Sequence, residues 1–132
     1  MTNARSVVPE PLSKNYTNWH FSPGHWADNV LFLSGCTGTD AEGHVSPDLS
    51  QQCHAAFAKL KLTLDAANLD FQDVVEITTY HVGLQKGLEI FKSIKDDYIV
   101  EPYPAWTAIG VVELASSGAM LEIRAVALDR NV

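Results

Sequence analysis

The pattern of hydrophobic and polar positions predicts β-structure in the first third of the chain. An apolar run at 29–34, closed by Gly35, has the length and flanking glycine of a buried strand. The aromatic stretch Tyr16–Trp26 is expected to pair with it as a hairpin around Asp28-Asn29. A loop rich in turn-forming residues follows at 37–43.

Apolar positions then recur at spacings of three and four, which predicts an amphipathic helix of about five turns. The periodic residues are Cys53, Ala56, Phe57, Leu60, Leu64 and Ala67. Asp48 offers an N-cap, with Gln51 three residues later as in a capping box, and Asn68 is a plausible end.

The second half of the chain predicts a strand, a helix and two further strands. Residues 73–83 are β-branched and aromatic, which favours a strand. A helix is predicted over 85–99, with Leu88, Phe91, Ile94 and Tyr98 on one stripe and Pro102 and Pro104 after its end. The final strands are expected at 105–112 and 119–128.

The element order β-β-α-β-α-β-β predicts an α+β fold in which two helices cover one face of one sheet. A single domain over 1–132 is expected, with residues 1–15 as an N-terminal arm. The other face of the sheet is predicted to be apolar and uncovered, through Ile109, Val111, Leu121 and Ile123. Such a face predicts an oligomer.

Composition narrows the possible partners. The net charge of −7, from 16 acidic and 9 basic residues, makes nucleic acid a poor partner. Apolar runs are too short to span a membrane, and residues 1–10 do not have the pattern of a signal peptide. With only two cysteines, a cytoplasmic protein is the simplest expectation. The five histidines have no metal-binding spacing, so we expect no metal and no other cofactor.

Four residues are candidates for chemistry, each with a structural alternative. Glu122 is either a solvated carboxylate beside Arg124 or a carboxylate in a cleft with a raised pKa. Cys36 is either a buried thiol or a nucleophile. Trp106 is either a core or interface aromatic or part of a pocket. Lys95 interrupts the apolar stripe of the second helix, and either extends to solvent or supplies a positive charge to a pocket.

Several segments together resemble the Rid family, also called the YjgF family, over nearly the whole chain. The resemblance rests on their order and spacing: Leu33-Ser34-Gly35 with Gly38 and Asp40, Gln51-Gln52 before Ala56-Phe57, Thr78-Thr79-Tyr80, Pro104-Ala105 and Leu121-Glu122-Ile123-Arg124-Ala125. Within the family, Pro102-Tyr103-Pro104, Trp106-Thr107-Ala108 and Lys95 are most similar to the YjgH-like members.

This resemblance implies a homotrimer with a six-stranded sheet in each subunit, and small-molecule clefts between subunits. Deaminating Rid proteins hydrolyse enamines or imines without a cofactor, using an arginine for the substrate carboxylate and a glutamate for water. Glu122 matches that glutamate, and Ser34 and Gly35 match the serine-glycine step that Cys36 follows. Trp106 replaces the arginine.

Two further family positions also differ, because Phe21 stands where deaminases have tyrosine and Lys95 where asparagine is common. We therefore expect a Rid-like hydrolase or deaminase with a rebuilt pocket. Glu122 is its catalytic residue, and Trp106, Phe21, Ser34, Gly35, Cys36 and Lys95 bind the substrate. The alternatives are a non-catalytic metabolite-binding trimer and a Cys36-dependent hydrolase.

Overall fold

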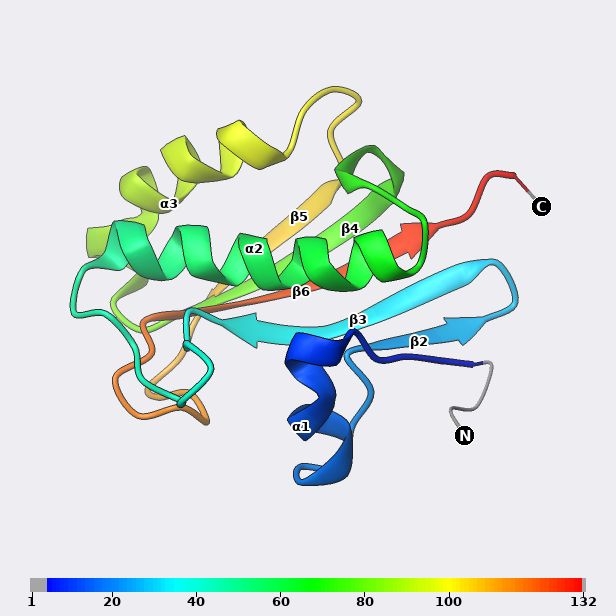
Figure 1. Cartoon of the computed structure of the whole chain (residues 1–132). Coiled ribbons are helices and arrows are strands. Elements are labelled where there is room, and N and C mark those ends of the chain that lie inside the picture. The colour runs from blue at the N-terminus through cyan, green and yellow to red at the C-terminus, as the bar shows by residue number, and fades with distance from the viewer. Residues whose placement is uncertain (1–4, 132) are drawn as a thin grey trace.

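A computed structural model of the chain describes residues 5–131 and has one mixed six-stranded sheet, in the order β1-β2-β3-β6-β4-β5. The strands are β1 (Ser6–Val7), β2 (Gly24–Ala27), β3 (Val30–Thr37), β4 (Val74–His81), β5 (Ala105–Gly110) and β6 (Leu121–Leu128). The helices are α1 (Ser13–Thr17), α2 (Leu49–Ala66) and α3 (Leu84–Tyr98), with 3-10 turns η1 (Glu10–Leu12) and η2 (Phe71–Asp73). Helices α2 and α3 cover the same face of the sheet, as predicted (Figure 1).

The predicted hairpin turn is confirmed, but its first strand is much shorter than expected. Strands β2 and β3 are antiparallel around Asp28-Asn29, and Asp28 has the positive φ of 52° that such two-residue turns require. Residues 16–23 are not a strand, because the chain forms α1 and then an irregular segment. Strand β1 was not predicted. It lies within the expected N-terminal arm and pairs with β2.

Helix α2 begins where the sequence indicates, with half of the predicted capping box. The Asp48 carboxylate accepts a hydrogen bond from the Gln51 backbone N–H at 3.3 Å. The Gln51 side chain does not reach back, because its Oε1 accepts from the Ser46 hydroxyl at 2.7 Å. The buried face of α2, including Phe57, Leu60 and Leu64, lies against the sheet.

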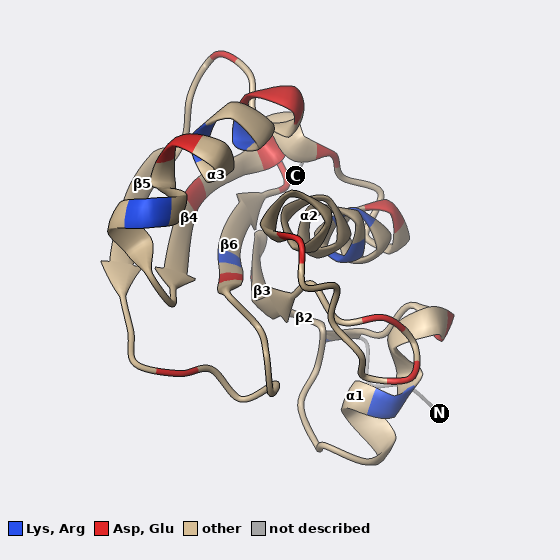
Figure 2. Ribbon diagram, turned by 90° about the vertical axis from the view of Figure 1, so that its left-hand side faces the viewer, with Lys and Arg blue, Asp and Glu red and all other residues tan. Residues whose placement is uncertain are grey.

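Helix α3 connects β4 to β5, which run parallel and therefore need a crossover connection. Aromatic rings join the two long helices, since the Phe57 ring stacks on Tyr98 at 4.5 Å between centroids and on Phe91 at 5.9 Å. Seen from the end of the sheet, α2 and α3 lie on one side and leave the other side without a helix (Figure 2).

The composition of the uncovered face differs from the prediction. Leu121 and Ile123 are fully buried beneath the helices, because β6 turns these alternate positions toward the core. The uncovered face instead carries Glu122 and Arg124, the latter 3.7 Å from the Glu76 carboxylate. Its exposed hydrophobic residues include Phe32 and Ile109, whose relative exposed areas are 41% and 40%. The face is therefore mixed rather than apolar.

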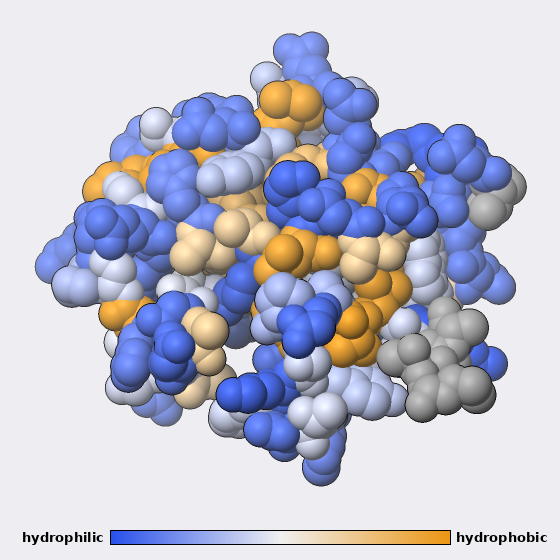
Figure 3. Space-filling view, viewed as in Figure 1, coloured by the Kyte–Doolittle hydropathy of each residue, from blue (hydrophilic) through white to orange (hydrophobic). Residues whose placement is uncertain are grey.

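The helix-covered side presents a different surface. Figure 3 shows hydrophilic atoms over most of this side, with hydrophobic patches between them. In the described part of the chain, Lys and Arg residues lie on several elements, among them α1, α2, α3 and β6 (Figure 2).

Candidate functional site

The Glu122 side chain lies against Gly35 across the β3–β6 pair. A Cβ built on Gly35 would come 2.6 Å from Glu122 Oε2 and 2.7 Å from its Cδ. The β-bulge between Leu33 and Cys36 lies at this point of the β3–β6 pairing. The absence of a side chain at Gly35 therefore permits this close approach, and Gly35 of the predicted Ser34-Gly35 step lies against the predicted carboxylate.

The environment of Glu122 favours its neutral form more than water does. Burial raises the pKa of the Glu122 carboxyl, while the positive charge of Lys59 acts in the opposite direction. Within residues 5–131, no protein donor forms a hydrogen bond with either carboxylate oxygen. The half-buried carboxylate is thus able to bind a water molecule or a substrate N–H.

Ser34, which precedes Gly35 on β3, is hydrogen-bonded to the segment that follows Phe21. The Ser34 hydroxyl donates to the Ser22 carbonyl at 2.7 Å, and the Ser34 backbone N–H donates to Pro23 O at 2.9 Å. These bonds hold the 21–23 segment on β3, with the Phe21 side chain 38% exposed. Gly35 thus lies against Glu122, and Ser34 links this point of β3 to residues 21–23. We call Phe21, Ser34, Gly35 and Glu122 the glutamate group.

Cys36 follows this group in sequence but faces the helices. It pairs with buried Ile123 in the β3–β6 register and packs against the core. Burial raises the pKa of its thiol to about 11, with a smaller opposing effect from Lys59. A thiol in this state is a poor nucleophile at neutral pH, so the structure gives no support to a Cys36-dependent hydrolase.

Trp106 and Lys95 form a second group, beneath α3. Trp106 Nε1 donates to Thr79 Oγ1 at 2.9 Å, and the same oxygen lies 2.7 Å from His81 Nε2. The ammonium of Lys95 lies 4.9 Å from the centroid of the Trp106 ring and 3.4 Å from Asp96 Oδ1. The indole N–H is therefore committed to the protein, and the ring face is what Trp106 offers to a ligand.

A cavity of about 370 Å³ adjoins this second group. Its lining residues are Ile77, Lys92, Lys95, Asp96, Ile99, Tyr103, Pro104 and Trp106. The lining combines two lysines with two aromatic rings, which suits a flat ligand that carries negative charge.

The two groups do not meet within one chain. Glu122 alternates with Leu121 and Ile123, which are buried under the helices, so its side chain projects from the uncovered face. Trp106 contacts Phe91 of α3 at 6.0 Å between centroids, which places it on the helix-covered face. The predicted pocket residues are therefore divided between opposite faces of the sheet.

Lys59 and Thr39 are charged and polar neighbours of the glutamate group that the sequence analysis missed. Lys59 Nζ donates to Thr39 Oγ1 at 2.6 Å, which fixes the α2 lysine at the end of β3. The only sequence signal was a lysine placed one position before Leu60 on the apolar stripe of α2. Its partners come from another element, so spacing alone could not identify them.

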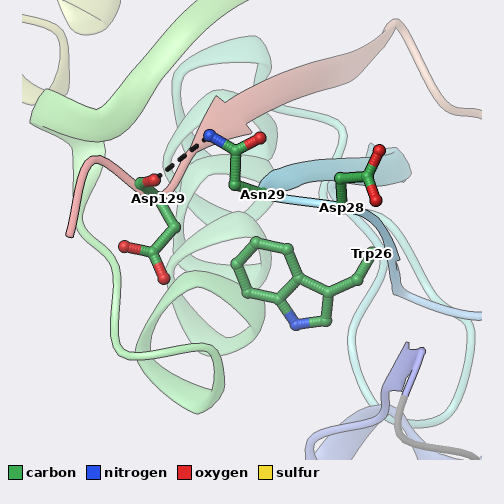
Figure 4. A pocket seen from close by; sticks show the side chains of 4 residues that line it. All are labelled: Trp26, Asp28, Asn29 and Asp129. Atoms are coloured by element: carbon green, nitrogen blue, oxygen red, sulfur yellow. Dashed lines mark hydrogen bonds between the residues drawn. The ribbon is translucent and has the colours of Figure 1, made fainter. Parts of the chain in front are cut away.

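A larger open cavity of about 610 Å³ lies elsewhere, at the β2–β3 turn. It is lined by Trp26, Asp28, Asn29 and Asp129, with the Asn29 amide donating to the Asp129 carbonyl at 3.4 Å (Figure 4). None of the predicted site residues lines it. We therefore assign the candidate site to the glutamate group and the Trp106 cavity, on their chemistry rather than on cavity size.

Comparison with known proteins identifies the family. The chain is 33% identical over 128 residues to the RutC family protein YjgH of Escherichia coli K12, covering 96% of both chains. The family model described as endoribonuclease L-PSP matches residues 13–129. The chain belongs to the Rid family. The predicted resemblance is thereby confirmed.

Solved structures agree with this assignment. The structure of protein YjgH has a TM-score of 0.85 and 33% identity, covering 93% of this Rid chain and 94% of the other. RidA from the Antarctic bacterium Psychrobacter sp. PAMC 21119 has a TM-score of 0.77 and 24% identity, covering 83% and 88%, which shows a shared fold. Rv2704 of Mycobacterium tuberculosis, at 19% identity over 96% of this chain and 100% of the other, has a TM-score of 0.81 and likewise shows the fold.

Two features are absent from the described residues. Between residues 5 and 131, no three His, Cys, Asp or Glu side chains lie together in a way that could hold a metal ion. In the same part of the chain, no helix has the length and hydrophobicity needed to cross a membrane.

Proposed function

We propose that this Rid protein is a small-molecule hydrolase of the enamine/imine deaminase type, with Glu122 as its catalytic base. The observation that carries the proposal is the Glu122 carboxylate itself, half-buried against Gly35 with a raised pKa and no protein donor on its oxygens. A base whose pKa lies closer to neutrality than usual is better suited to proton transfer near pH 7.

The chemistry requires one water and no redox step. Glu122 accepts a proton from water as the water oxygen bonds to the imine carbon, and the C=N double bond becomes a single bond. The same carboxyl group returns that proton to nitrogen, which gives a carbinolamine. Glu122 then moves the hydroxyl proton of the carbinolamine to the same nitrogen, and the C–N bond breaks, so that ammonia leaves as the C=O bond forms. The products are a carbonyl compound and ammonia, so atoms and charge balance.

A complete pocket would need a second copy of the chain, because Glu122 and Trp106 lie on opposite faces of one sheet. We propose a homotrimer in which the Trp106 and Lys95 side chains of one subunit face the glutamate group of a neighbour. The exposed Phe32 and Ile109 on the uncovered face support association of this kind. Lys95 and the Trp106 ring would hold the anionic, flat part of the substrate.

Ammonia release from imines generated by an amino-acid oxidase tests the catalytic proposal. We expect Glu122→Gln to lose about 10²- to 10⁴-fold in rate, because the amide cannot accept the proton. Glu89→Gln is the matched control, since it removes one carboxylate from the exposed side of α3. Failure of the wild-type protein to accelerate ammonia release from any imine or enamine in the panel would overturn the deaminase assignment.

The alternative is a non-catalytic metabolite-binding trimer. It is favoured by the Trp106 cavity, whose lysines and aromatic rings form a binding surface regardless of any reaction at Glu122. Thermal shifts with flat anionic compounds, without turnover of any of them, would support this function. Hydrolysis of RNA, the activity named in the family description, is less well supported, because the chain carries −7 net charge and its basic residues are scattered (Figure 2).

A further inference from the structure

Lys59 of α2 reaches the end of β3 near Glu122, although the two residues are 63 positions apart in sequence. Its Nζ donates to Thr39 Oγ1 at 2.6 Å, and Thr37 Oγ1 donates to the same oxygen at 3.3 Å. Thr37 in turn lies directly opposite Glu122 in the β3–β6 register. Residues paired in this way project from the same face, with Cβ atoms roughly 5 Å apart.

The lysine is held in place, not simply near the site. Thr39 accepts hydrogen bonds from both Lys59 and Thr37, and Thr37 is buried with its hydroxyl 3.5 Å from Ser116 Oγ. Two donors therefore converge on Thr39 Oγ1, one from α2 and one from the end of β3, and Thr37 links them to the loop before β6. A lysine fixed by such contacts has less freedom to move its charge away than an exposed one.

We propose that Lys59 is a positioning residue for Glu122: its ammonium, fixed by Thr39, favours the ionised carboxylate in the site. This inference rests on the proposed role of Glu122 as the base. Burial lowers the pKa of Lys59, and the nearby Cys36, Glu122 and Asp40 each act in the opposite direction, favouring the ammonium. The coupling is mutual, since Lys59 opposes the burial effect on Glu122.

The other ionisable groups around Glu122 do not replace this charge. Arg124, two positions along β6, is paired with the Glu76 carboxylate at 3.7 Å. Tyr80 of β4 lies opposite Glu122 in the β4–β6 register, and Cys36 of β3 is a thiol with a pKa of about 11. Neither a phenol nor a thiol supplies a positive charge, which leaves Lys59 as the cation that acts on Glu122 within the described residues.

The test measures the titration of the Glu122 carboxyl carbon directly by NMR, so that it does not depend on turnover. Lys59→Met should move the Glu122 midpoint to higher pH, and Lys59→Arg, which keeps the charge, should return it toward the wild-type value. Thr39→Val removes the acceptor that fixes the ammonium and should give a smaller upward shift. Lys61→Met is the matched control, because Lys61 lies on the same helix but pairs with Asp65 at 3.1 Å.

Turnover provides the second readout. If Glu122 is the base, Lys59→Met moves the acid limb of the pH–rate profile to higher pH, so that the rate on that limb falls by about 3- to 10-fold while the plateau is retained. An unchanged Glu122 midpoint in a folded Lys59→Met variant would overturn the positioning role. A shifted midpoint in a wild-type protein that hydrolyses no imine would instead leave this role intact and reject the proposed function.

Discussion

Replacing Gly35 by alanine should separate the stability of the fold from the placement of its candidate base. The new Cβ would stand 2.6 Å from Glu122 Oε2, 2.7 Å from its Cδ and 2.9 Å from its Cγ. All three atoms belong to one flexible side chain, which can rotate away. The backbone at Gly35 is outside the left-handed region, so alanine adds no backbone strain there.

The expected cost in folding free energy is small and the expected cost in activity is large. Moving Glu122 from its preferred rotamer costs about 1 kcal/mol, which lowers the melting temperature by about 3–5 °C in a domain of this size. Displacing a catalytic group by roughly 1 Å lowers the rate by about 10²-fold. The freed carboxylate also becomes more hydrated, so its pKa should fall toward the ordinary glutamate value.

Gly38→Ala is the contrasting variant. A Cβ on Gly38 would come 2.6 Å from the Cα and carbonyl oxygen of Gln52, which are backbone atoms of α2 and cannot rotate away. This substitution should cost about 1–3 kcal/mol or more, because α2 and the segment after β3 must separate. Urea unfolding gives both stabilities, and NMR titration gives the Glu122 pKa. If Gly35→Ala were as destabilising as Gly38→Ala, or left the Glu122 pKa unchanged, the contact between Gly35 and Glu122 would not have the role argued above.

Three further outcomes are expected. Burial raises the folded-state pKa of Glu122, so the contribution of this carboxyl to stability falls as pH rises through the folded-state pKa. The stability of Glu122→Gln relative to wild type should therefore be greater at pH 8 than at pH 4, as measured by guanidinium unfolding at the two pH values. Trp106→Phe should cost about 1 kcal/mol in urea unfolding through loss of the N–H bond to Thr79, and less in a Thr79→Val background. Cys36, whose thiol pKa is about 11 rather than 9.0, should react with iodoacetamide about 100-fold more slowly than a free thiol, and Cys36→Ala should retain any imine hydrolysis.

Local sequence determined most of the secondary structure. The 3.6-residue periodicity predicted several ends of α2 and α3 to within one residue of their observed positions. The Asp28-Asn29 turn could be predicted because Asp and Asn tolerate a positive φ. The errors came where neighbours decide the outcome. The aromatic segment before Trp26 has strand-like composition, but only Gly24–Ala27 pairs with β3.

Side-chain alternation along β6 also gave the correct face for Glu122 relative to its neighbours, because the period of a strand is two. It did not reveal which face the helices cover. Leu121 and Ile123 were therefore wrongly predicted to lie on the uncovered face, whereas they are completely buried beneath α2 and α3. A pattern along one strand fixes relative sides, and only packing between layers decides which side is the interior.

Only the tertiary structure decided which candidate residues share an environment. The β3–β6 register and its bulge place Gly35 and Thr37 beside Glu122, and α2 packing adds Lys59, whose position in sequence says nothing of that contact. The same pleat separates Glu122 from Trp106 on opposite faces of the sheet. Chemical type is a property of the residue, whereas charge state and contact depend on groups far away in the chain, and those are fixed only when strands and helices come together.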